Sequence, residues 1–397
     1  MFDRFLSKGT AKALAKVLAK APDRRKVLAG AALACLAACK TVPTTTTAPP
    51  PPPEHPTSSL PADTQRHRVA LIVPLSGPNS AIGQSIANAA TMAVLDTNAD
   101  NLRITTYDSA AGVPAAASRA IADGNKLILG PLLGGDTPVV ANAARNARVP
   151  VISFSNDTTV AGNNVYIMGN VPEQSIQRTI RYARSQGAAR FAALIPAGEY
   201  GERVSGAVMD AMRRSGGTMV AMENYDRSTA AVGAAVRRLN ARGPFDAVLI
   251  ADGGRIALQA APLLKPRGTG PRLLGTELWS GEAGLMTTPA LRGAWFSAVS
   301  DTRYRQFSDS YRNRFGGAPY RLSTLGYDAV LLTLRIARDW RPGTPLPTGK
   351  LTDSGGFLGL DGAFRFDRGV IERAFEVREV RAGGITVVSP APAKFED

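Results

Sequence analysis

Cysteine and histidine are almost missing from this chain. Its 397 residues contain two cysteines, Cys35 and Cys39, and two histidines, His55 and His67, all of which precede Arg68. The rest of the chain therefore has no thiol, no disulfide and no imidazole. This excludes Ser-His-Asp and Cys-His nucleophilic catalysis, and metal sites built on His or Cys, from everything after Arg68. We expect no metal and no cofactor.

Acidic residues are also in short supply. Aspartate and glutamate number 32 against 47 lysines and arginines, so the net charge is +15. Residues 1–38 hold eight Lys or Arg and two Asp, which supply +6 of this charge and leave +9 for the remainder. The remaining arginines are scattered rather than clustered with aromatics, so we expect no nucleic-acid partner. A solvated basic surface and a dedicated polyanion site both fit this charge, and the first is the simpler interpretation.

The N-terminal stretch has the pattern of an export signal. Residues 23–26 (Asp-Arg-Arg-Lys) precede a twelve-residue apolar run over residues 27–38. That run is too short for a membrane-spanning helix, which needs about 20 residues. Residues 36–39 (Leu-Ala-Ala-Cys) resemble the bacterial lipobox, which implies removal of residues 1–38 and acylation of Cys39. The alternative is an ordinary cleavage site with an incidental cysteine.

Further features of this stretch concern export route and location. Residues 23–28 also resemble a twin-arginine signal, so general and twin-arginine export both stay open. Lys40 after the cysteine resembles the outer-membrane sorting pattern. We therefore expect lipid anchoring on the periplasmic side of the cell envelope, at the outer membrane. Residues 39–67 are rich in Thr and Pro and predict an extended, disordered tether.

The remaining chain alternates strand and helix patterns. A continuous apolar run at residues 69–73 predicts a strand buried on both faces, followed by a polar turn and an Ala-rich helix from about 80 to 96. The alternation restarts at residues 191–195, and two such runs imply two lobes, each with a parallel sheet. We expect one domain over 68–382 and a C-terminal tail over 383–397. Its first lobe would comprise about 68–167 and 278–350, and its second about 170–275 and 351–382.

Six short segments carry a family resemblance through their order and spacing. They are residues 69–83, 128–132, 149–155, 200–201, 326–329 and 362–367. Together they resemble type I periplasmic binding proteins of the leucine/amide class, over roughly residues 68–380. The resemblance implies an α/β fold of two Rossmann-like lobes, each a parallel sheet flanked by helices. Three crossovers would join the lobes, with a ligand cleft between them.

A narrower resemblance concerns residues 155–162 and 165–174. With the lipobox and the tether, they resemble the penicillin-binding protein activator lipoproteins, which stimulate peptidoglycan synthases from the outer membrane. The implied partner is a peptidoglycan synthase. Larger members of that group carry an N-terminal helical-repeat domain where this chain has its tether. The alternative is a substrate-binding lipoprotein of an ABC importer for branched-chain amino acids or amides, with an ABC permease as partner.

The resemblance also implies a ligand site. In leucine-type binders, loops after the strands hold the ligand carboxylate through hydroxyl and backbone N–H groups, and an acidic group meets the ammonium. The matching positions are Ser76, Gly130, Pro131, Ser153, Ser155 and Tyr200. Nearby polar candidates are Asn79, Asn156, Asp157, Glu173 and Glu277. They predict a small zwitterionic or amide ligand.

Each of these side chains has an alternative role. The serines also suit turns or helix caps, and Tyr200 also suits packing between lobes. An enzyme would have to rely on carboxylates alone, for example Glu173 with Glu277 as a glycosidase pair. Nothing in their spacing supports such a pair, so we expect a protein without catalytic activity.

Overall fold

The computed structural model describes residues 63–392 and Phe395. The expected signal peptide, the acylation of Cys39 and most of the expected tether lie outside the described residues. Among the described helices, none combines the length and the apolar character needed to cross a bilayer.

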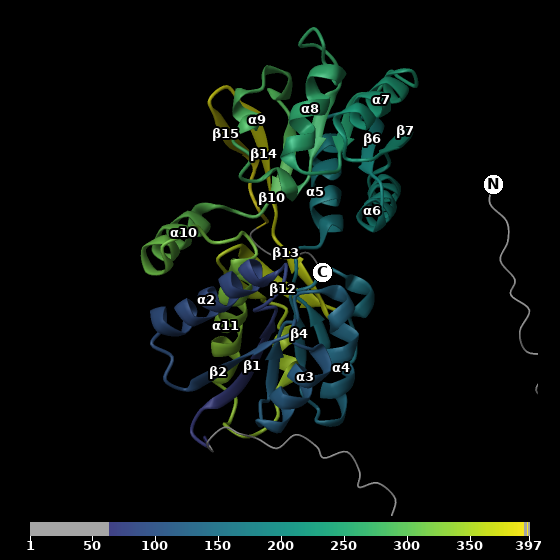
Figure 1. The fold of residues 1–397 in the computed structure, drawn as a ribbon. Helices are drawn as coiled ribbons and strands as arrows, with labels where there is room; N and C mark the ends of the chain where they lie inside the picture. Colours follow the sequence, from purple (N-terminus) through teal and green to yellow (C-terminus); the bar gives the residue numbers. More distant parts are fainter. Residues whose placement is uncertain (1–62, 393–394, 396–397) are drawn as a thin grey trace, which may run out of the picture. The chain divides into compact units, whose positions relative to one another are not determined.

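The first lobe is built around an eight-stranded sheet (Figure 1). Its strand order is β11-β12-β13-β5-β4-β3-β1-β2, and β2, β1, β3, β4, β5 and β13 are parallel to one another. The antiparallel pairings β11–β12 and β12–β13 close one side of the sheet. The strands are β1 (His67–Val73), β2 (Leu102–Asp108), β3 (Leu127–Leu129), β4 (Val151–Ser153), β5 (Val165–Ile167), β11 (Phe357–Gly359), β12 (Gly362–Asp367) and β13 (Val370–Arg373).

Strand β1 lies at the centre of this lobe because it is apolar on both faces. Val69, Leu71 and Val73 pack in one core cluster with α2 (Ser80–Asp96) and α11 (Ser323–Ala337). Ala70 and Ile72 pack in another with α3 (Val113–Ala122) and α4 (Thr137–Asn146). Helix α10 (Thr302–Phe315) packs on α2. A strand with helices on both faces explains the uninterrupted apolar run.

The second lobe repeats this plan with a seven-stranded sheet of order β15-β14-β10-β9-β8-β6-β7. Helices α5 (Pro172–Ser185) and α6 (Glu199–Ser215) share one core cluster. Helices α7 (Thr229–Asn240) and α8 (Gly254–Leu264) share the other, and α9 (Gly284–Thr287) packs on α8. The strands are β6 (Arg190–Pro196), β7 (Thr218–Tyr225), β8 (Ala247–Ile250), β9 (Arg272–Gly275), β10 (Trp295–Ala298), β14 (Glu376–Arg381) and β15 (Gly384–Ser389).

The chain crosses between the two sheets three times, as expected. The crossovers lie between β5 and α5, between β10 and α10, and between β13 and β14. The predicted α/β architecture of two largely parallel sheets flanked by helices is therefore confirmed.

The expected lobe boundaries were wrong in two places. Residues 278–298 belong to the second lobe, because β10 pairs in parallel with β9 and antiparallel with β14. Residues 351–373 belong to the first lobe, because β13 pairs with β5. In addition, β15 pairs with β14 and continues the second sheet into the expected C-terminal tail.

Candidate functional site

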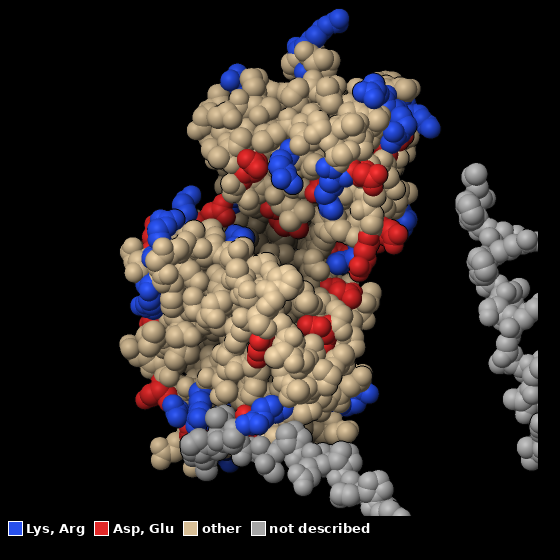
Figure 2. All heavy atoms as spheres, in the orientation of Figure 1, with Lys and Arg blue, Asp and Glu red and all other residues tan. Residues whose placement is uncertain are grey.

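The two sheets present their carboxyl edges to each other. Arg203, in the first turns of α6, donates a 2.8 Å hydrogen bond from Nη2 to the main-chain oxygen of Asn156, which follows β4 in the other lobe. The same guanidinium lies 3.2 Å from Oε1 of Glu173, near the start of α5. Figure 2 shows the surface hollowed where the lobes meet. Ligands of parallel α/β sheets bind at such edges, so this interlobe cleft is the candidate site.

The first lobe forms one wall of the cleft, and the loops after β1 and β2 contribute a hydroxyl group to it. Ser76 is exposed, and its hydroxyl donates to Oδ2 of Asp108 at 2.7 Å, while the Leu75 N–H donates to Oδ1 at 2.8 Å. These bonds, with the Leu75 N–H as the largest contribution, lower the pKa of Asp108. Asp108 therefore stays ionised and orients Ser76. Asn79 lies at the N-cap of α2, and its side chain makes no capping hydrogen bond there.

The loop after β3 brings the backbone close to β1. Gly130 has φ +94°, and a Cβ atom built on it would lie 2.1 Å from the carbonyl oxygen of Ile72. Only glycine fits this position without a shift of the backbone. Pro131 is buried, and its carbonyl oxygen accepts hydrogen bonds from the Phe154 N–H at 2.9 Å and the Ser153 hydroxyl at 3.1 Å.

The serine that ends β4 and the serine that follows it use their hydroxyls within the lobe. Ser153 is fully buried, and its Oγ lies 2.9 Å from Oγ1 of Thr137 and accepts the Ser155 N–H. Ser155 is buried too, and its Oγ accepts the Asp157 N–H at 3.0 Å. Both hydroxyls therefore stabilise the local turn, which is the alternative role that the sequence suggested for these serines. Of this loop, Asn156 is the exposed residue that reaches the other lobe.

The second wall holds a buried hydroxyl, that of Tyr200. The Tyr200 hydroxyl is enclosed and has no hydrogen-bond partner among the described residues. Burial, together with the nearby negative charges of Glu277 and Asp252, raises the pKa of Tyr200 above its usual range. A neutral phenol that lacks a partner can donate to, or accept from, a ligand group that enters beside it.

Acidic side chains surround this hydroxyl. Asp252 follows β8 and accepts hydrogen bonds from the Tyr225 hydroxyl at 3.0 Å and from Nε of Arg227 at 2.8 Å. Glu277 follows β9, and its carboxylate accepts a hydrogen bond from the Ser175 hydroxyl at the start of α5. Burial raises the pKa of Glu277. The wall therefore favours a cationic group, which would lower the pKa of Glu277 again.

The structure thus groups the predicted residues by lobe. It brings Tyr200, Glu173 and Glu277 together in the second lobe. It gathers Gly130, Pro131, Ser153 and Ser155 behind the surface of the first lobe, with Ser76, Asn79 and Asn156 in more open positions.

Four charged residues of this site escaped the sequence analysis. They are Asp108, Arg203, Arg227 and Asp252. Asp108 ends β2 and Asp252 lies two residues after β8, and such positions at strand ends can be found from the sequence. Arg203 and Arg227 gave no local signal, because their partners come from distant segments. Within the described residues, no group of three or more His, Cys, Asp or Glu side chains is arranged to hold a metal ion.

Solved structures share this fold at low identity. A putative branched-chain amino acid ABC transporter protein from Rhodospirillum rubrum is 18% identical, covers 81% of this chain and all of its own, and superposes with a TM-score of 0.68. A leucine-binding protein from Thermotoga maritima is 18% identical over 82% of this chain and 99% of its own, with a TM-score of 0.58. Full-length LpoA from Haemophilus influenzae is 19% identical over 82% of this chain and 60% of its own, with a TM-score of 0.66.

Among curated proteins, an uncharacterised protein of Rickettsia prowazekii is 25% identical over 174 residues, or 43% of this chain. The match spans about half, 47%, of that relative. The sequence profile described as "Periplasmic binding protein" matches residues 67–384. This match covers both lobes and all three crossovers, and shows that the chain belongs to the periplasmic binding protein family, whose members are typically non-catalytic.

Proposed function

We propose that this chain is a non-catalytic envelope protein that captures a small ligand with an ammonium group, such as an amino acid or an amino-acid amide, between its lobes. The observation that carries the proposal is the Tyr200 hydroxyl, which lies near Glu277 and Asp252 and has no hydrogen-bond partner among the described residues. With Glu173, this side of the cleft has three carboxylates. Only two guanidiniums lie beside them, those of Arg203 and Arg227. These five groups together have one negative charge in excess, which a ligand ammonium group would neutralise.

The opposite wall supplies the polar groups for the rest of such a ligand. The exposed Ser76 hydroxyl and the amide of Asn156 lie on loops that follow β1 and β4. A charge-assisted hydrogen bond contributes about 1.5–3 kcal/mol, so two or three of them would orient a zwitterion. The similar structures from R. rubrum and T. maritima are named for branched-chain amino acid transport and leucine binding, which supports this ligand class.

In this role the partner is an ABC permease, and the chain is a substrate-binding lipoprotein held to the envelope by an acylated Cys39. A thermal-shift screen of amino acids and their amides tests the ligand. A binding ligand raises the melting temperature in proportion to the logarithm of its concentration. If no amino acid or amide shifts the transition at millimolar concentration, this function is rejected.

A second candidate function is supported by Arg203. Its guanidinium ties Asn156 to Glu173, which lie near the two ends of the stretch that resembles penicillin-binding protein activators. A side chain of the protein itself thus joins the lobes. A regulator that binds no small ligand would need such a contact to hold its lobes together. Full-length LpoA shares the fold, although this chain matches only 60% of it.

For that role the partner is a peptidoglycan synthase, and the chain acts from the outer membrane. Titration of a purified synthase with the full chain tests it. Saturable binding that is unchanged by amino acids would favour the regulator over the importer. Absence of binding at micromolar concentrations would reject it.

A further inference from the structure

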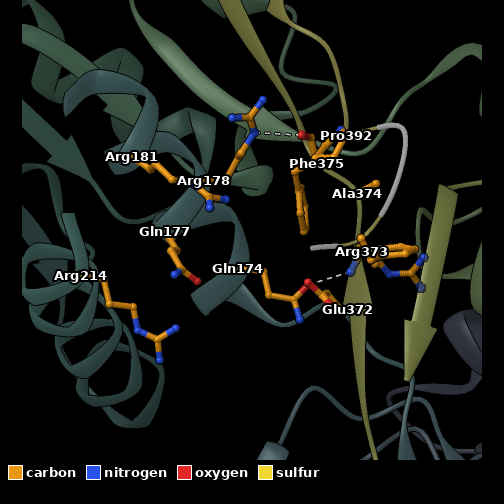
Figure 3. Close-up of a pocket in the computed structure, with 11 residues that line it drawn as sticks. Gln174, Gln177, Arg178, Arg181, Arg214, Glu372, Arg373, Ala374, Phe375 and Pro392 are labelled. Atoms are coloured by element: carbon orange, nitrogen blue, oxygen red, sulfur yellow. Dashed lines mark hydrogen bonds between the residues drawn. The ribbon is translucent and has the colours of Figure 1, made fainter. Parts of the chain in front are cut away.

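A second hollow lies where the lobes meet, away from the candidate cleft. It has a volume of about 660 Å³ (Figure 3). Its described lining shares no residue with the cleft, although Gln174 directly follows Glu173 on α5. Its walls come from α5 and the last turn of α6 in one lobe, from β13 and the crossover to β14, and from Pro392 and Phe395 after β15. A neighbouring hollow of about 670 Å³ shares Gln174, Gln177, Arg214 and Glu372 with it. We call this surface the hinge groove.

On the helix side of the hinge groove, Arg181 and Arg214 have no acidic partner among the described residues. Arg181 on α5 and Arg214 on α6 are exposed, and the structure shows no hydrogen bond or ion pair of either side chain within residues 63–392. Figure 3 shows both on the helix side of the pocket, with Gln177 beside them. Gln174, Gln177 and Arg181 recur at intervals of three and four, so they share one face of α5.

Glu372 is the one acid in the described lining of the hollow of about 660 Å³, and it does not neutralise these arginines. Glu372 lies on β13, and its Oε2 accepts a 2.7 Å hydrogen bond from Nε of Arg365. Its charge is therefore already paired. Among the described residues, the hinge groove keeps a surplus of positive charge, in contrast to the acidic wall of the cleft.

The opposite wall is held to α5 by hydrogen bonds and includes two aromatic rings. Gln174 donates from Nε2 to the Ile371 carbonyl at 2.5 Å and accepts the Arg373 N–H on Oε1 at 3.0 Å, which ties α5 to β13. Phe375 and Phe395 present aromatic rings to the same hollow. A ligand there would meet guanidiniums on one side and rings on the other.

We propose that the hinge groove binds a small organic anion, with a phosphate or carboxylate head between Arg181 and Arg214 and an apolar body against Phe375. Guanidinium groups suit such heads because their donors bind both oxygens at once. The volume lies in the range of small-molecule sites, about 300–1,000 Å³. Because the walls come from both lobes, a bound anion is coupled to the arrangement of the lobes and hence to the cleft.

Phenyl phosphate is the probe for this proposal, titrated calorimetrically into the full chain. We expect saturable binding, weaker binding of inorganic phosphate, and none of benzyl alcohol. The double variant Arg181→Gln/Arg214→Gln should weaken binding of phenyl phosphate by at least about ten-fold. The matched control is Arg242→Gln/Arg255→Gln, which removes two exposed arginines elsewhere in the second lobe and should leave the affinity unchanged.

Three results would overturn the proposal. The first is no heat from phenyl phosphate at millimolar concentration. The second is unchanged affinity in the Arg181→Gln/Arg214→Gln variant, which would place the probe elsewhere. The third is an equal loss in the control, which would mean that only the overall charge matters.

Discussion

The guanidinium of Arg203 donates to the main-chain oxygen of Asn156 at 2.8 Å and so joins the two lobes directly. It also contacts Glu173 at 3.2 Å, beside the crossover into the second lobe. The contact therefore spans the line along which the lobes would have to separate.

Replacing Arg203 should release the lobes. We expect Arg203→Met to increase the mean radius of gyration in small-angle X-ray scattering, while the free energy of unfolding falls by less than about 1 kcal/mol, since the contact is partly exposed. The control is Arg213→Met on the same helix, whose partner Asp210 lies within the lobe. An unchanged radius in Arg203→Met would show that the contact does not restrain the lobes.

Replacing Tyr200 should affect stability and ligand affinity in opposite directions. The Tyr200 hydroxyl is buried without a partner in the described structure, so Tyr200→Phe removes a desolvated group and should leave stability equal or higher. Ligand affinity should fall about ten-fold, because the ligand loses a hydrogen bond. Tyr225→Phe serves as the contrast. It breaks a bond to Asp252 and should lower stability by about 1 kcal/mol. A large loss of stability in Tyr200→Phe would contradict this assignment.

Replacing Asp328 should change how stability depends on pH. Asp328 on α11 is fully buried; burial, with Asp361 nearby, raises its pKa to about 7 from the ordinary 3.8. Its Oδ1 accepts the Leu360 N–H at 2.6 Å, while Oδ2 has no partner among the described residues. Because the folded state holds this proton more tightly, its contribution to stability is complete below pH 3.8 and is lost as pH rises towards about 7.

Asp328→Asn mimics the protonated acid, and its amide oxygen can still accept the Leu360 N–H. We expect this variant to lose much of the fall in unfolding free energy across that pH range, as measured by urea denaturation. Glu277 shifts in the same direction and remains in the variant, so the difference between the two proteins isolates Asp328. Identical pH profiles would contradict the role of Asp328.

Gly130→Ala should destabilise the first lobe. The added Cβ would meet the Ile72 carbonyl at 2.1 Å, at a φ of +94°. We expect a loss of at least about 2 kcal/mol in unfolding free energy. Gly253→Ala is the matched control, because Gly253 has φ −61° and open space around its Cβ position. Equal stabilities of the two variants would show that the loop after β3 adapts.

The sequence predicted the regular parts of the fold well. The apolar run of residues 69–73 is strand β1, and the Ala-rich stretch that follows is α2. It failed at residues 278–298, where a 3-10 turn (Glu277–Trp279) and the short α9 precede β10 and give no clear period. It also failed at residues 351–373, because which sheet a strand joins depends on partners distant in sequence.

The positions of some candidate site residues could be predicted from the strands, but their contacts could not. Loop positions after strands could be found from the strands, and Tyr200 and Glu277 do lie together. The sequence does not reveal whether a hydroxyl faces a ligand or its own lobe. Ser153 is an example, because its hydroxyl forms hydrogen bonds with Thr137 and Pro131. Such contacts depend on the geometry of three loops at once.

The most direct measurement is a calorimetric titration of the best ligand from the amino acid and amide screen into the full chain and its Glu277→Gln variant. Glutamine can keep the hydrogen bond from the Ser175 hydroxyl but cannot supply the negative charge that an ammonium group needs. The account predicts one saturable site in the native protein and an affinity at least about ten-fold lower in the variant. Equal affinities in both proteins would contradict it.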